Sequence, residues 1–214
     1  SEEVWKQTCV EVHPEPDVLC VIVRIIELAV GKHGIHKPVP RVQGILAADE
    51  SSTTADQRFN ALSIPATEEN RRTYREILFT TPGIEEYLSG VILFDETIRQ
   101  TSHANISFPA LLAEKNILSG IKVDQGLEDG HGGQVTKGMS GLSLRLGEYK
   151  NLGATFTKWR AVARVGDGFA DPAIKENAER LASYATAVLQ SGMVPMIEPE
   201  VLMEGTHSAE ACEG

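Results

Sequence analysis

Acidic and basic residues stand at the carboxyl ends of four apolar segments in this sequence, where parallel α/β proteins build active sites. An aspartate follows the first segment, and each of the other three carries two charged residues separated by one position; they are Asp49, Lys122 and Asp124, Lys158 and Arg160, and Glu198 and Glu200. In a strand, residues two apart point to the same face. A buried charge is costly unless it is paired, so we expect these side chains to meet one another.

Lysines and carboxylates that share a site of low dielectric shift each other's pKa values, which prepares general acids and bases near neutral pH. A single charged pair of this kind can also be a solvated rim or a structural ion pair. Because four segments repeat the arrangement, the pattern favours an active site, although it does not specify one reaction.

Five short runs rich in β-branched residues predict the strands that carry these charges. They span residues 44–48, 91–94, 120–123, 154–162 and 193–197. Segments with helical periodicity separate them. The residues from Thr67 to Asn70 form a helix-capping signature, and further helices are expected over 108–116, 139–152 and 172–190.

Alternating strands and helices imply βαβ units and a parallel sheet, so the predicted fold class is α/β. Five strands complete an open doubly wound sheet, whereas a (β/α)8 barrel requires eight, and the spacing leaves both open. The glycine-rich stretch 126–138 contains no nucleotide-binding pattern, and we interpret it as a flexible loop.

The composition limits the partners of the chain. Of its 214 residues 42% are hydrophobic, and the formal net charge of −10 argues against nucleic acid or an anionic membrane surface as a partner. A local cluster of cations can still bind a phosphorylated substrate. Three cysteines without CxxC spacing indicate no disulfide framework, and we expect a cytoplasmic protein. The apolar run 18–30 is too short to span a bilayer.

Two smaller features can be explained without a functional role. The hydroxyl run 51–54 (SSTT) can donate hydrogen bonds to a phosphate, but the same residue types cap helices. The histidines have no metal-ligand spacing, since His33 and His36 form only a loose pair, and we predict no metal site.

Seven sequence blocks resemble the class I fructose-bisphosphate aldolase family, in the same order and at the same spacing. They are GILAADES (44–51), TEENRRTYR (67–75), GVILFDET (90–97), GIKVDQG (120–126), KWRAV (158–162), ENAERLASYA (176–185) and VPMIEPE (194–200). The resemblance implies a (β/α)8 TIM barrel, here truncated to about five βα units. It divides the chain into a divergent N-terminal segment, 1–43, and a partial aldolase barrel, 44–214.

The resemblance also implies an activity. The family consists of lyases that cleave fructose 1,6-bisphosphate reversibly to dihydroxyacetone phosphate and glyceraldehyde 3-phosphate in glycolysis. They use a lysine Schiff base and no metal or other cofactor. They usually form homotetramers, and their partners are small-molecule sugar phosphates.

Individual roles follow from position within the motifs. Asp49 corresponds to a residue that contacts substrate hydroxyls and helps to move protons, and Lys158 to one that assists carbon–carbon cleavage. Glu198 corresponds to the general acid/base of Schiff-base formation, with Glu200 as its partner. The substrate and phosphate side is assigned to Ser51, Thr54, Arg58, Lys122 and Arg160.

The Schiff-base lysine of the family stands in a KPN motif, which does not occur in these 214 residues. A retro-aldol step needs a base at the C4 hydroxyl and an electron sink at C2, and the lysine iminium is that sink. We therefore expect the chain as given to be inactive in Schiff-base turnover. The alternative function is a non-catalytic, aldolase-like module that binds sugar phosphates or a protein.

Overall fold

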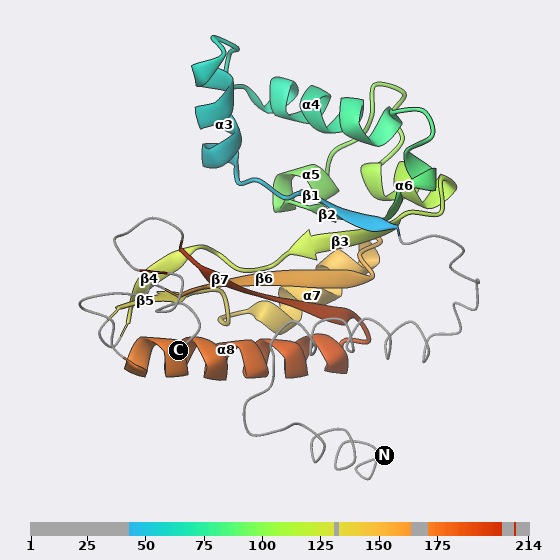
Figure 1. Cartoon of the computed structure of the whole chain (residues 1–214). Coiled ribbons are helices and arrows are strands. Elements are labelled where there is room, and N and C mark those ends of the chain that lie inside the picture. Colours follow the sequence, from blue (N-terminus) through green and yellow to red (C-terminus); the bar gives the residue numbers. More distant parts are fainter. Residues whose placement is uncertain (1–42, 131–132, 164–170, 203–207, 209–214) are drawn as a thin grey trace. The chain divides into compact units, whose positions relative to one another are not determined.

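The five predicted strands form one parallel sheet, shown in the computed structural model of the chain (Figure 1). The structure describes residues 43–130, 133–163, 171–202 and 208, all within one compact unit, Val39–Gly214. The strands are β1 Gly44–Ala48, β2 Leu88–Leu93, β3 Leu118–Lys122, β6 Phe156–Ala163 and β7 Val194–Val201. Their order is β1-β2-β3-β6-β7, and every neighbouring pair is parallel.

The strand order distinguishes between the two folds that the spacing left open. The five strands stand in the sheet in the same order as they occur in the chain, so the order never reverses. A doubly wound sheet reverses its order at a switch point and carries helices on both faces. A sheet that grows in one direction through right-handed crossovers places its helices on one face. The described strands therefore wind as they do in a (β/α)8 barrel.

Helices connect the strands, and side-chain caps at Ser51, Thr67 and Ser107 fix where three of them begin. The helical elements are α3 Ser52–Ala61, α4 Glu68–Thr80, η1 Ile84–Glu86, α5 Asp95–Ile98, α6 Phe108–Glu114, α7 Leu142–Asn151 and α8 Asp171–Gln190. Thr67 Oγ1 accepts a hydrogen bond from the Asn70 amide at 3.1 Å, which confirms the predicted cap of α4. Ser51 Oγ accepts from the Thr54 amide at 3.2 Å, so the hydroxyl run caps α3.

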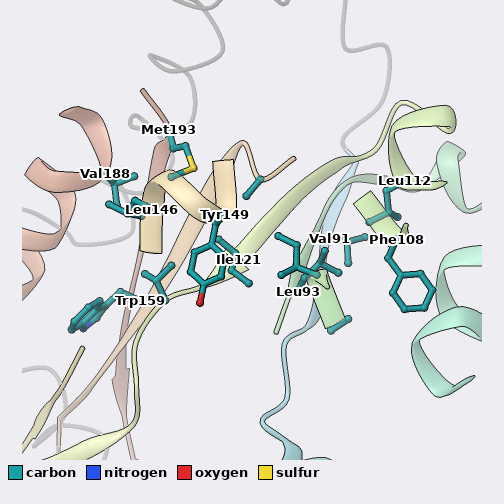
Figure 2. Close-up of a cluster of buried hydrophobic side chains, with 14 of the residues drawn as sticks. Val91, Leu93, Phe108, Leu112, Ile121, Leu146, Tyr149, Trp159, Val188 and Met193 are labelled. Carbon is teal, nitrogen blue, oxygen red and sulfur yellow. The ribbon is translucent and has the colours of Figure 1, made fainter. Parts of the chain in front are cut away.

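The helix-covered face of the sheet is an apolar core (Figure 2). Alternate strand residues, among them Leu93, Ile121 and Trp159, are fully buried there against helix residues such as Leu146 and Val188. α8 packs along β6 and β7. Because apolar burial is the main stabilising contribution in folding, this face holds the sheet in place.

On the opposite face of the sheet, one aromatic ring packs against two glycines of neighbouring strands. Phe156 lies beside Gly120 in the β3–β6 register, and a Cβ on Gly120 would collide with its ring atoms Cε2 and Cζ. A Cβ on Gly90, one strand further, would lie 3.2 Å from the same ring. The two glycines therefore make the space that the ring occupies.

The interpretation of 126–138 as a flexible loop is wrong. This stretch contains an antiparallel hairpin, β4 Leu127–Gly130 and β5 Gly133–Thr136. Val135 is buried, and the Thr136 amide donates a 2.9 Å hydrogen bond to Asn177 Oδ1 on α8. These contacts are tertiary, so glycine content alone did not indicate them.

Several predictions concern residues outside the described part of the chain. They include the run 18–30, the two histidines at 33 and 36, the three cysteines and all but the last residue of the predicted segment 1–43. Among the helices that the structure does describe, none combines the length and the apolar character needed to cross a bilayer.

Candidate active site

Three of the predicted catalytic residues meet in one ion-paired cluster. The Lys158 Nζ atom lies 2.9 Å from Asp49 Oδ2 and 2.7 Å from Glu198 Oε2. Lys158 belongs to β6, Glu198 to β7, and Asp49 follows β1 directly. In a flat sheet β1 and β6 would lie about 14 Å apart, three strand spacings. The contact therefore shows that the sheet curls around the face that carries these side chains.

The two carboxylates keep Lys158 protonated. Burial acts to lower the pKa of Lys158, but hydrogen bonds from its ammonium group to Glu198 and Asp49 outweigh burial and raise the pKa above its ordinary value. A protonated lysine cannot attack a carbonyl carbon, whereas it can donate a proton or stabilise negative charge. The cluster is thus suited to proton transfer among three groups rather than to nucleophilic attack by Lys158.

Glu200 lies in a second pair, one layer further along the strands. Arg160 binds it through both Nε and Nη2, and the Nη2 to Oε1 distance is 2.9 Å. The hydrogen bond from Arg160 lowers the pKa of Glu200, and the same contact raises the pKa of Arg160. The side chains are 37% and 39% exposed, so this pair is open to solvent and to a ligand.

The end of β3 is tied to β6 beside the cluster. Lys122 forms an ion pair with Asp124, whose Oδ2 accepts a 3.2 Å hydrogen bond from the Arg160 amide. Lys122 and Lys158 are register partners in the sheet. Two lysines can stand side by side here because each ammonium group has its own carboxylate.

A cavity of about 580 Å³ opens next to these pairs. Four predicted binding residues line it: Ser51, Thr54, Lys122 and Arg160. The Ser51 and Thr54 hydroxyls are 2.9 Å apart. Lys158 does not line the cavity, but its register partner does. Cations and hydroxyls are the groups that bind phosphate oxygens, so a cavity lined by both suits a phosphorylated ligand.

Arg58 is the predicted binding residue that the structure does not bring into the cavity. Its Nη1 atom lies 2.5 Å from Glu50 Oε1, and its side chain is 62% exposed. The position of Arg58 in the sequence, close to the hydroxyl run, predicted proximity to the phosphate side. Its ion pair directs the guanidinium elsewhere.

Two buried or half-buried arginines support the site and were not predicted. Arg75 on α4 donates to the main-chain oxygens of Ala48 and Glu50, and Arg145 on α7 donates to Val123 O at 2.7 Å. Both arginines lie on the apolar side of their helices. Arg75 is four residues before the buried Phe79 of α4, and Arg145 stands between the buried Leu142 and Leu146 of α7. A charged residue in phase with an apolar stripe was the signal available in the sequence.

Comparisons with known proteins agree with this geometry. The sequence model of the fructose-bisphosphate aldolase class-I family matches residues 32–214. A probable fructose-bisphosphate aldolase class 1 of Xanthomonas campestris pv. campestris is 49% identical over 174 residues, covering 79% of this chain and 52% of that protein. Fructose-bisphosphate aldolase 4, cytosolic, of Arabidopsis thaliana is 41% identical over 217 residues, covering 97% of this chain and 54% of its own length. The chain thus spans about half the length of the curated relatives it matches.

A solved structure extends the likeness to three dimensions. It is fructose-bisphosphate aldolase from Plasmodium falciparum, determined in a complex with TRAP and a small-molecule inhibitor. The two chains share 41% sequence identity and superimpose with a TM-score of 0.79, over 88% of this chain and 55% of that one. The winding of the sheet, its (β/α)8-type fold and the seven motifs lead to one conclusion: the chain belongs to the class I fructose-bisphosphate aldolase family.

Proposed function

We propose that this protein takes part in the reversible cleavage of fructose 1,6-bisphosphate to dihydroxyacetone phosphate and glyceraldehyde 3-phosphate. The observation that carries the proposal is the contact of Lys158 with both Asp49 and Glu198 at the carboxyl end of a curled parallel sheet. A retro-aldol step moves one proton from a hydroxyl and returns one to carbon. The cluster holds two carboxylates that accept protons and one ammonium that donates them.

Within this proposal the three groups have separate tasks. Asp49 accepts the proton of the substrate C4 hydroxyl, while Glu198 serves as acid and base for Schiff-base steps on the KPN lysine of the family, which these 214 residues do not contain. The iminium on that lysine would take up the electron pair of the broken C3–C4 bond. Lys158 stays charged and stabilises negative charge that develops on oxygen. Glu200 acts through Arg160, because its hydrogen bonds fix that guanidinium and hold its charge near the cluster.

The cavity supplies the binding side of the same proposal. Lys122 and Arg160 provide positive charge for a phosphate, and the hydroxyls of Ser51 and Thr54 lie on the same lining. Arg160 must release or share Glu200 when a phosphate arrives. Binding and the Arg160–Glu200 pair are therefore in competition.

The test compares the wild-type protein with K158M in a coupled assay of triose phosphate release from fructose 1,6-bisphosphate. In a protein that carries this chain together with the Schiff-base lysine of the family, we expect cleavage in the wild type and its loss in K158M, since methionine keeps the length of the side chain and removes the charge. The 214 residues alone, which lack the KPN motif, should release no triose phosphate. K175M is the matched control, because it makes the same change at Lys175 on α8, whose side chain is 78% exposed and which does not line the cavity. Equal cleavage by K158M and the wild type would refute the proposed role of the cluster.

A second function, non-catalytic binding of a sugar phosphate, has one observation in its favour. The lysine at the centre of the cluster has a raised pKa and is not a nucleophile, whereas the cationic wall of the cavity needs no further group in order to bind. Calorimetry with fructose 1,6-bisphosphate separates the two functions. Saturable heat without triose phosphate release supports binding alone.

The cellular location and the assembly state of the protein are part of the same proposal. We propose a cytoplasmic location and a homotetramer, with sugar phosphates as the ligands and no cofactor. Curated relatives include cytosolic proteins of Arabidopsis thaliana and a chloroplastic one of Chlamydomonas reinhardtii. Sedimentation of the purified protein and imaging of a tagged copy test the assembly and the location.

A further inference from the structure

The backbone at Asp49 is not held by strand pairing. The β1–β2 ladder ends with Ala48 opposite Leu93, one residue before the carboxylate, and α3 begins only at Ser52. Within the described residues β1 pairs with β2 alone. A carboxylate that must meet Lys158 at hydrogen-bond distance therefore needs other contacts to fix its segment.

Arg75 supplies contacts on both sides of this position. Its Nη2 donates to Glu50 O at 2.8 Å and its Nε to Ala48 O at 3.4 Å. These are the carbonyl oxygens of the residues that flank Asp49 in the chain. Nη2 also lies 3.5 Å from Glu50 Oε2, and Arg75 as a whole is 1% exposed. One planar guanidinium thus spans the residue that bears the carboxylate.

Packing alone does not account for an arginine at this place. Its Nη1 atom is buried and has no hydrogen-bond partner among the described residues. Leaving a buried donor unpaired costs about 1–3 kcal/mol, and an apolar side chain would fill the same space without that cost. Arg75 also pairs with the Glu50 carboxylate, and its Cζ lies 5.4 Å from the centroid of the Tyr74 ring. Its two hydrogen bonds, however, both go to the main chain around Asp49, so the guanidinium fixes that main chain.

We propose that Arg75 is a positioning residue: by holding the carbonyl groups on both sides of Asp49, it directs the Asp49 carboxylate at Lys158. The inference rests on the proposed function only for its consequence in catalysis. The structural claim concerns Asp49 and Lys158 alone. It can therefore be tested without substrate.

The test measures how fast Lys158 is acetylated by N-acetoxysuccinimide at mildly alkaline pH, with site-resolved mass spectrometry. Only the neutral amine reacts, so loss of a carboxylate partner speeds the reaction. Lys175, whose side chain is 78% exposed on α8, is the internal reference in every sample. D49N sets the scale: losing one opposite charge at this distance lowers a lysine pKa by about one unit or more, so labelling should rise about tenfold.

We expect R75K and R75Q to increase Lys158 labelling several-fold toward the D49N rate. Lysine keeps the buried charge but lacks the two-pronged donor geometry, and glutamine removes the charge altogether. The double variant R75K/D49N should label no faster than D49N, because both changes remove the same contact. R72K is the matched control, since Arg72 lies on the same helix and pairs with Glu69 and Glu76 instead.

Three labelling outcomes would overturn the proposal. They are folded Arg75 variants that label at the wild-type rate, an equal increase in R72K, and an additive increase in the double variant. Failure of both Arg75 variants to fold, judged by near-ultraviolet circular dichroism, would assign Arg75 to general stability and also overturn it. Absence of fructose 1,6-bisphosphate cleavage in a wild-type protein that carries the Schiff-base lysine would refute the proposed function while leaving the labelling result intact.

Discussion

Alternate residues of β6 face two different environments, and the strand is therefore both a core element and a wall of the site. Thr157 and Trp159 point toward α8, where Tyr184 bonds the threonine hydroxyl at 2.6 Å and lies 5.2 Å from the indole ring. Lys158 and Arg160 point to the other face, into the charged pairs. One period-2 strand thus carries apolar burial and ionic contacts side by side.

The two faces of the sheet contribute differently to folding stability and to chemistry. The core face gains free energy from every buried apolar atom. The charged face gains little, because its ion pairs mostly offset the cost of removing charges from water. Changes on the core face should therefore alter unfolding, and changes on the charged face should alter ligand binding and pH dependence.

The largest effect on stability is expected from W159A. Truncating a fully buried tryptophan costs about 3–5 kcal/mol of unfolding free energy, and Trp159 is 0% exposed. Urea denaturation measures this loss, and calorimetry well below the melting temperature should give unchanged affinity for fructose 1,6-bisphosphate. W159F is the control: Trp159 Nε1 has no hydrogen-bond partner among the described residues, so phenylalanine loses area only. Loss of affinity in folded W159A would contradict the division between the faces.

K158M should have the next largest effect on stability. Removing one member of a buried ion pair leaves Asp49 and Glu198 uncompensated, at a cost of about 3 kcal/mol or less, because Glu198 is partly exposed. Urea denaturation of both proteins at neutral pH measures the difference.

Alkaline pH should remove the stability that Lys158 contributes to the wild type. The folded state raises the pKa of Lys158, so the stability it contributes is complete below the unfolded value of about 10.4. That contribution is lost as the pH rises through the folded pKa, and K158M has none to lose. Parallel alkaline stability curves for the two proteins would show that Lys158 is not held by its carboxylates.

The smallest effect on stability is expected from E200Q. The Arg160–Glu200 pair is half-exposed, and such pairs contribute about 0–1 kcal/mol. Arg160 lowers the pKa of Glu200, so the contribution is present above the unfolded value of about 4.3 and is lost as the pH falls through the folded pKa. Added salt should reduce it further.

E200Q should also sharpen the contrast between stability and binding. It frees Arg160 for a phosphate, so calorimetry should show equal or tighter binding of fructose 1,6-bisphosphate. E179Q removes an exposed carboxylate of α8 at the same charge change and is the control. Weaker binding by E200Q alone would mean that Glu200 itself contacts the ligand.

The sequence predicted the strands well, because apolar runs bounded by charges report burial directly. It placed the start of β6 and β7 within two residues, and it missed the first three residues of β2, where Leu88 and Ser89 are only partly buried. It did not predict α3, whose composition is mostly polar. The β4–β5 hairpin escaped notice because its stability comes from Asn177 and other residues distant in the chain.

The site was predictable to the extent that strand ends determine it. The charges at the strand ends predicted, without knowledge of the sheet order, that residues such as Asp49, Lys158 and Glu198 would meet, and the structure shows that contact. Their catalytic roles stay predictions. The clamp made by Arg75 could not be inferred from spacing, since its partners are main-chain oxygens that the side-chain pattern does not reveal. The same limit applied to Arg58, whose direction depends on Glu50.

The contact between Phe156 and Gly120 bears on how this protein could be redesigned. Lys158 and Lys122 stand two residues above that contact and are register partners. A methyl group added at Gly120 would collide with the ring, so the ring or the two strands must shift, and a shift of the strands changes the separation of the two ammonium groups without replacing either. The spacing of these two cations therefore depends on packing two residues away from them, and a redesign of that spacing would begin at Gly120.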